Sequence, residues 1–150
     1  MNLVNIRKIE QDILGRLQNI NTLIEDFNNV NNTDLEKIKN ITNTYVKLQF
    51  PEIFIYCDKI NYLQEEFQSN YKYKIEYDFY ISIAIKTNKI DLLNFYVNCY
   101  AEILANLFYN FQTENIAFID FVNFVKEEAQ TQDLQTLKIG VFNIKAVSII

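Results

Sequence analysis

The side chains of this chain that could do chemistry are carboxylates and two cysteines, because the sequence contains no histidine. Without histidine, the chain lacks the commonest general base, the Ser–His and Cys–His nucleophile pairs, and imidazole ligands for a metal. Two cysteines are too few for a structural zinc site, and two glycines leave no phosphate-binding loop. We therefore expect no enzymatic activity, no cofactor, and no catalytic or metal-binding residues.

Carboxylates do occur in pairs, as Glu65 with Glu66, Glu127 with Glu128, and Glu76 with Asp78. Adjacent residues point to opposite sides of a strand, so neither adjacent pair is arranged to share a Mg²⁺ ion or a proton. Each pair also falls on an expected loop or exposed face. We interpret all of them as solvated charges.

The charge and hydropathy of the chain exclude two further classes of function. The net charge is −5, whereas dedicated nucleic-acid binding favours basic surfaces. Basic and aromatic residues alternate in Tyr71–Lys74, but Glu76 and Asp78 follow directly. No apolar run approaches the length of a membrane helix, and no signal-peptide pattern is visible. We expect a cytosolic product in which the two cysteines, Cys57 and Cys99, stay buried thiols, although they could in principle pair.

Two helical patterns stand out. Isoleucine, leucine and phenylalanine recur every three or four residues over 6–27, which predicts an amphipathic helix. Residues 28–34 read as a break, after which Leu35, Ile38 and Ile41 predict a short second helix capped by Thr33 or Asp34. Residues 89–111 predict a long helix that is apolar almost all round. Such a helix must be covered on more than one side, by the sheet and by either the first helix or a partner subunit.

The strands follow from alternation and from proline. Pro51 leads a short apolar strand at 52–57, and a polar connection is expected at 58–70. Residues 71–85 alternate strictly, which predicts a strand with one buried face. Fifteen residues span about 50 Å, so this strand outruns a small domain, and its charged half at 71–78 could project as a β-arm.

The closing part of the chain reads as a β-hairpin. Its strands are expected at 116–125 and 135–149, with a polar connection at 126–133. The apolar alternation of the second strand shifts by one residue beside Gly140, which predicts a β-bulge there.

Together these patterns predict one α+β domain over residues 1–150, in which two long helices pack on one face of a mostly antiparallel or mixed sheet of about four strands. The expected core consists of the apolar faces of the three clearest elements. Its members are Ile13, Leu17, Ile20, Ile75, Tyr77, Phe79, Ile81, Ile83, Leu93, Val97, Ile103, Leu104 and Leu107.

The residues expected to contact other subunits are charged and lie outside that core. Even positions of the long strand alternate away from the buried face and are free to meet a partner. Carboxylates of the two polar connections join them. The candidate subunit-interface residues are Lys72, Lys74, Glu76, Asp78, Glu65, Glu66, Glu127 and Glu128.

The order of these elements resembles the tail-terminator, or tail-completion, family of tailed phages and phage-tail-like particles. The resemblance lies in the charged start of the first helix at 6–10, the proline-led strand at 50–56 and the long alternating strand at 71–81. A tyrosine-rich helix and a closing hairpin follow. The resemblance covers most of the chain. It rests on the order of the elements and on the residue pattern of the strands, and the segment at 33–48 is longer than in the family.

The resemblance implies a virion protein made in the host cytoplasm. Proteins of that family form hexameric rings on the head-proximal end of the tail tube, end its polymerisation and join the tail to the neck. The implied partners are other copies of the chain, the tail-tube protein and a neck or connector protein, with the sheath as a further candidate. DNA would pass through the ring without specific binding. The alternatives are a neck or head-closure protein of the same virion and a small cytosolic adaptor or immunity protein.

Overall fold

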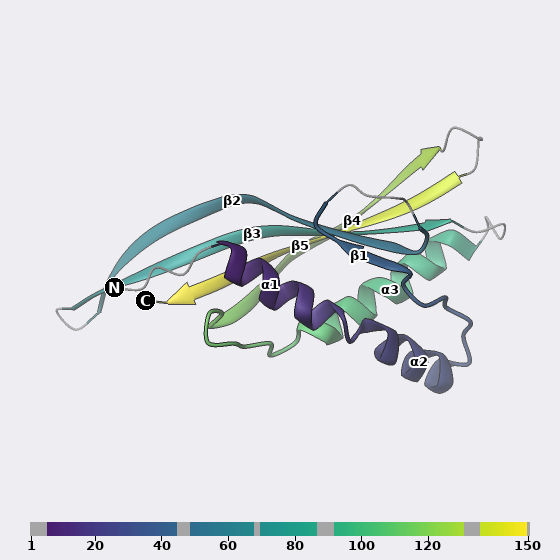
Figure 1. Ribbon diagram of the computed structural model, residues 1–150, viewed down its shortest axis with the longest axis horizontal. Helices are drawn as coiled ribbons and strands as arrows, with labels where there is room; N and C mark the ends of the chain where they lie inside the picture. Colours follow the sequence, from purple (N-terminus) through teal and green to yellow (C-terminus); the bar gives the residue numbers. More distant parts are fainter. Residues whose placement is uncertain (1–5, 45–48, 68–69, 87–91, 131–135, 150) are drawn as a thin grey trace.

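The computed structural model describes residues 6–44, 49–67, 70–86, 92–130 and 136–149. It shows long, strongly twisted strands lying across a layer of helices (Figure 1). The elements are α1 (Ile6–Leu17), α2 (Ile20–Asn31), β1 (Asn40–Thr42), β2 (Glu52–Phe67), β3 (Asn70–Lys86), α3 (Leu93–Phe108), β4 (Phe118–Gln130) and β5 (Thr136–Ile149). The predicted α+β class with helices on one face of the sheet is confirmed.

The sheet has five strands in the order β1-β2-β3-β5-β4. Only the β1–β2 pair is parallel, and the other three pairs are antiparallel. The strand at the centre is β3, which confirms the strongest strand prediction. It pairs with β2 from Asn70 to Ala84 and with β5 from Lys74 to Lys86.

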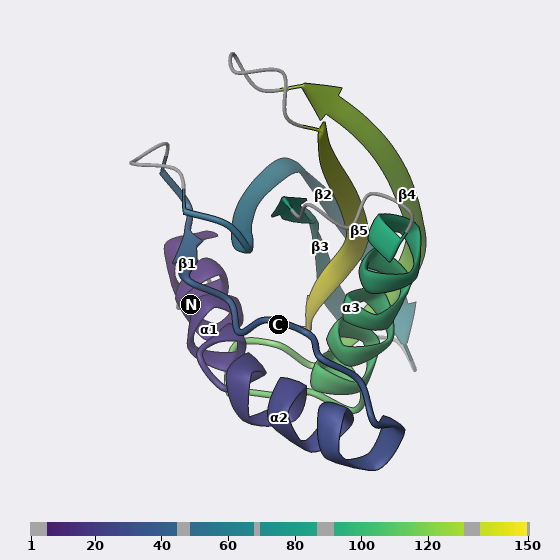
Figure 2. The same ribbon diagram turned by 90° about the vertical axis from the view of Figure 1, so that its right-hand side faces the viewer.

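The helices enclose a single core beneath the sheet. Figure 2 shows the sheet curling over them, with α1 and α3 on either side and α2 below. A bend at residues 18–19 separates α1 from α2, yet the apolar face continues across it from Ile9 to Ile24. All thirteen residues of the expected core are buried, each with at most 3% of its surface exposed.

Most of the apolar surface of α3 is covered within the subunit. One side packs on β3, β4 and β5, and another packs on α1 and α2. Of the two covers expected for the second side, the first helical region supplies one. Phe95 near the start of α3 nevertheless remains 49% exposed.

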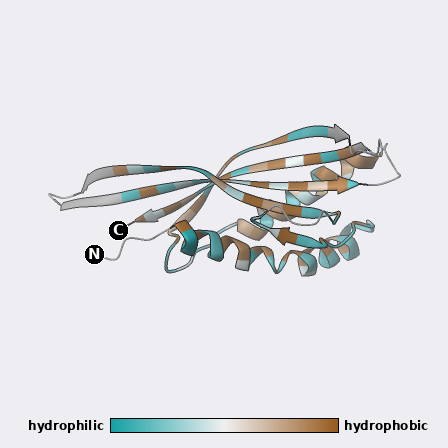
Figure 3. Cartoon of the chain, turned by 45° about the horizontal axis from the view of Figure 1, so that its top comes forward, coloured by the Kyte–Doolittle hydropathy of each residue, from teal (hydrophilic) through white to brown (hydrophobic). Residues whose placement is uncertain are grey.

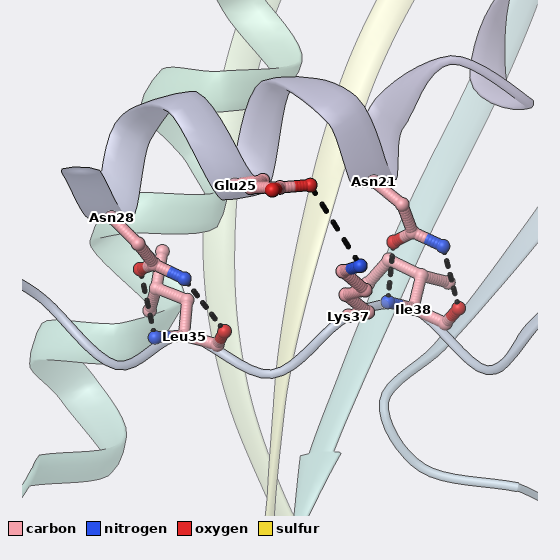
Figure 4. A network of polar contacts seen from close by, with 6 residues as sticks. All are labelled: Asn21, Glu25, Asn28, Leu35, Lys37 and Ile38. Carbon is pink, nitrogen blue, oxygen red and sulfur yellow. Dashed lines mark hydrogen bonds and ion pairs between the residues drawn. The ribbon is translucent and has the colours of Figure 1, made fainter. Parts of the chain in front are cut away.

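The predicted short helix around Leu35 and Ile38 is wrong. The helix α2 ends at Asn32, which has a left-handed backbone (φ 53°), and residues 33–39 then run extended. Two side-chain amides of α2 hold this segment (Figure 4). Asn28 accepts a bond from the Leu35 N–H (2.9 Å) and donates to the Leu35 carbonyl (2.9 Å), and Asn21 does the same with Ile38 (2.7 and 3.1 Å).

These amides substitute for a neighbouring strand. Each satisfies one backbone N–H and one carbonyl that would otherwise be left half-buried without a partner. The spacing of Asn21 and Asn28 is two helical turns, so both amides point to the same side of α2. We call Asn21, Asn28 and the backbone of residues 35–38 the amide clamp. It buries Leu35 and Ile38 without a helix.

Replacing Asn28 with alanine is expected to lower the free energy of unfolding by about 1–3 kcal/mol, because a half-buried N–H and carbonyl of Leu35 lose their partners. Asn28→Asp keeps the acceptor and loses the donor, so its effect should be smaller. Chemical denaturation of both variants measures this. Asn29→Ala, at an exposed position of the same helix, is the control. Equal effects at Asn28 and Asn29 would contradict the clamp.

The two predicted polar connections are largely strand. Residues 58–67 belong to β2 and residues 126–130 belong to β4. The first forms a long hairpin with β3, whose end reaches beyond α1 (Figure 1). Residues 68–69 and 131–133 lie outside the described residues. The expected projecting arm at 71–78 is therefore wrong for residues 74–78, which pair with β5 inside the sheet, and the part of β3 before Lys74 pairs with β2 alone.

The predicted β-bulge beside Gly140 is also wrong. Pairing of β5 with both neighbours is regular there, and the sheet's two irregularities lie at Asp58 in β2 and Val122 in β4. Gly140 is needed for packing instead. A Cβ at this position would lie 2.4 Å from the Phe124 ring and 2.9 Å from a Val97 methyl group. Its backbone is not left-handed, so the close approach alone requires glycine.

Candidate assembly surface

The face of the sheet that points away from the helices is the candidate site. We call it the open face. It is formed by the even positions of β3 from Lys74 to Ala84 and by their cross-strand partners on β2, β4 and β5. All three described helices lie on the other side (Figures 1 and 2). Figure 3 shows hydrophobic and hydrophilic residues mixed along these strands.

Charged residues of the open face form a linked cluster. Glu76 lies between two lysines, with Lys74 at 3.4 Å and Lys145 at 3.8 Å. Next along β3, Asp78 has Lys59 of β2 at 3.9 Å. The Lys74 ammonium also lies 5.9 Å from the centre of the Phe118 ring. The cluster joins all four long strands.

The expectation that these even positions of β3 are free to meet a partner is wrong for Asp78. It holds only in part for Lys74 and Glu76, which are partly covered. Asp78 is only 4% exposed, and its Oδ1 is buried without a hydrogen-bond partner. Side chains of Lys74 and Glu76 are 26% and 14% exposed. The twist of the sheet brings neighbouring long side chains over these positions, so alternation away from the core does not leave them in solvent.

The remaining predicted interface residues lie at two ends of the sheet. Glu65, Glu66 and Lys72 belong to the far end of the β2–β3 hairpin, where the backbone register pairs Glu65 with Lys72. Glu127 and Glu128 lie on the outer strand β4 and are exposed. Glu128 accepts a 2.8 Å bond from Lys138, which lowers the pKa of its carboxyl group.

Aromatic residues of the open face were not among the predicted site residues. Tyr56 stacks on Tyr80 with ring centres 5.3 Å apart, and Phe54 lies 5.9 Å from Tyr56. Tyr56 remains 42% exposed. The signal was present in the strand at 52–57, which is apolar on both faces. A strand that is apolar on both faces in a sheet covered on one side leaves an apolar stripe outside.

Two hollows lie on the helical side of the molecule. The first is beside the 33–39 segment, where the Tyr96 hydroxyl donates to Asp34 (3.0 Å) and the Tyr100 hydroxyl donates to the Glu36 carbonyl (2.5 Å). Burial raises the pKa of Tyr100. Both hydroxyls are used to join α3 to this segment. The second hollow is a groove between α2 and α3 with Asp26 and Glu102 at its rim.

The cysteines do not form a disulfide. Cys57 is half-buried on β2 and Cys99 is buried on α3, and both are free. Burial, followed by the charge of Asp78, raises the pKa of Cys57 to about 11, so its thiol stays protonated at neutral pH. Among the described residues, no group of three histidine, cysteine, aspartate or glutamate side chains is placed to hold a metal. None of the helices in the described part of the chain is long and apolar enough to cross a membrane.

No protein-family model matches the chain, and no characterised protein matches it with significant sequence similarity.

Proposed function

We propose that this chain is the subunit of a ring that caps the head-proximal end of a phage tail tube, ends its polymerisation and joins the tail to the neck. The observation that carries the proposal is the β2–β3 hairpin, which extends past the helical layer (Figure 1). A strand pair of sixteen and seventeen residues is far longer than the usual five or six. Such a long hairpin offers strand backbone to a neighbouring subunit.

The open face supports the same proposal. This face presents the aromatic side chains of Phe54, Tyr56 and Tyr80 together with the charged cluster on a single surface. A sheet face covered by other elements would contribute only to stability. Ring subunits need two different contact surfaces, one meeting the other on the next copy.

Electron microscopy of tail tubes assembled without this protein tests the proposal. Added protein should form one ring per tube, at one end only, and should stop further growth of the tube. The double variant Glu65→Lys/Glu66→Lys reverses charges on the hairpin and should cap fewer tubes. Asp26→Lys/Glu102→Lys reverses two carboxylates at the helical groove and should cap tubes normally.

Three outcomes would contradict the terminator. Protein bound along the length of the tube, or in a ratio other than one ring per tube, is incompatible with a cap. Binding to a purified portal or neck complex, with no binding to tubes, would instead indicate a head-closure protein. A monomer or dimer that binds neither would indicate an adaptor.

A further inference from the structure

Both outer edges of the sheet are long and unpaired in the described part of the chain. On one side β4 pairs only with β5, which leaves the other edge of its thirteen residues open. On the opposite side β1 pairs with β2 only at Glu52–Phe54. The eleven residues 57–67 of β2 have no neighbouring strand on their outer side among the described residues.

Unpaired edges are usually protected, because their free N–H and C=O groups pair with other chains. Here neither edge contains proline, and each contains four charged residues: Asp58, Lys59, Glu65 and Glu66 on β2, and Asp120, Lys126, Glu127 and Glu128 on β4. Each edge strand has one bulge, at Asp58 or Val122, and neither bulge interrupts pairing on the inner side for more than one residue.

Apolar side chains are exposed along both edges. On β4, Phe121, Val122 and Val125 are 44%, 48% and 48% exposed. On the open part of β2, Tyr62 and Leu63 are 71% and 41% exposed. Cross-strand contacts between aromatic and β-branched side chains are the unit of stabilisation in a sheet. A strand laid against either edge would supply such contacts.

The directions of the two edges make them partners for each other. Three antiparallel pairings separate β2 from β4, so β4 runs opposite to β2. A rotation that carries one copy to the next around a ring, with strands along the ring axis, preserves these directions. The β4 edge of one copy then meets the β2 edge of the next in an antiparallel ladder, the more stable arrangement.

We propose that β4 of one copy pairs with residues 57–67 of β2 in a second copy, so that copies join head-to-tail through a continuous sheet. The head-to-tail geometry stands on the two edges alone, and its closure into a ring rests on the proposed function. The contact is heterologous, because the two edges are different surfaces. It leaves the open face free for other partners.

Two edge variants test the pairing. Val125→Lys blocks the β4 edge and Leu63→Lys blocks the β2 edge, since lysine on an edge strand opposes pairing. Val30→Lys is the control, at a position of α2 that is 83% exposed. Circular dichroism and thermal unfolding should show that all three fold. Sedimentation velocity at millimolar protein then measures assembly.

The wild-type chain and the Val30→Lys control should form species larger than a dimer. Each edge variant alone should associate at least about tenfold more weakly than the wild-type chain. An equimolar mixture of the two edge variants should form a dimer and nothing larger, because each supplies the edge that the other lacks. This restored dimer is the result specific to head-to-tail pairing.

Other outcomes overturn the pairing. The pairing is contradicted if the wild-type chain stays monomeric at millimolar concentration. It is also contradicted if both edge variants assemble as strongly as the wild type. Dimers of Leu63→Lys alone, with none from Val125→Lys, would show β4 pairing with β4. Wild-type assembly that fails to cap tubes would contradict the terminator and leave the pairing standing. Capping by both edge variants would contradict the pairing alone.

Discussion

Replacing Ile81 with alanine is expected to lower the free energy of unfolding by about 2–5 kcal/mol. Ile81 is fully buried at the centre of β3, between Ile55 of β2 and Phe142 of β5. A cavity there cannot be filled by movement of an edge strand, because paired strands flank β3 on both sides. The loss therefore includes both the transfer of the side chain and the cavity that remains.

Leu104→Ala should have an effect of the same size from the helical side, because Leu104 is fully buried on α3. Urea denaturation of both variants gives the two free energies. The matched control is Val30→Ala, which shortens an exposed side chain and should change stability by less than about 0.5 kcal/mol. Losses near zero at both core positions would mean that the buried faces are wrong.

Adding one methyl group at Gly140 is expected to cost about 1–3 kcal/mol. The new Cβ of Gly140→Ala would overlap the Phe124 ring and a methyl group of Val97. Phe124 is half-buried on an outer strand and can move, whereas Val97 is fully buried and cannot. The effect should therefore become smaller, but not vanish, in a Phe124→Ala background.

A double-mutant cycle measures this coupling. Thermal or urea unfolding of the wild type, the two single variants and the double variant gives the free energy of interaction between the positions. Additive losses would show that Phe124 does not restrict position 140. A stabilised Gly140→Ala variant would show that ordinary glycine entropy, and not close packing, governs this position.

Patterns with one buried face were predicted well from the sequence. The alternation in β3 and the three- and four-residue spacing in α1, α2 and α3 each state which side chains meet the core. Such patterns do not depend on distant residues. For this reason all thirteen expected core residues are buried, and the sheet with helices on one face could be anticipated.

Elements held by distant polar groups were not predictable in this way. Residues 33–39 have apolar side chains at helical spacing, but the amides of Asn21 and Asn28 bind their backbone in an extended form. The bulge at Asp58 interrupts the alternation of β2, and among residues 58–63 only Ile60 packs, in part, against the core. A strand with so little of one face buried needs no strict alternation, so its sequence reads as a polar connection.

The candidate site shows a related limit. Alternation correctly assigned Lys74, Glu76 and Asp78 to the side of β3 opposite the core. It could not show that Lys59 and Lys145, from two other strands, lie over that side and bind the carboxylates. Nor could it identify the edges, because strand order depends on pairings between residues far apart in the sequence. The sequence pattern predicts the face of the sheet on which a side chain lies, whereas the strand order determines how exposed that side chain is.

The position of β5 between β3 and β4 has a consequence for the order in which the protein folds. β4 and β5 pair as a hairpin that is local in sequence, but this hairpin joins the rest of the sheet only when β5 lies against β3, and that pairing joins residues as far apart as Lys74 and Ile149. Closing so long a loop is slow compared with forming either hairpin. Until it closes, the inner edge of β5 and the outer edge of β4 are both open, and strands of other unfinished copies compete for them. Correct assembly therefore requires that each copy complete its own sheet before it meets the next.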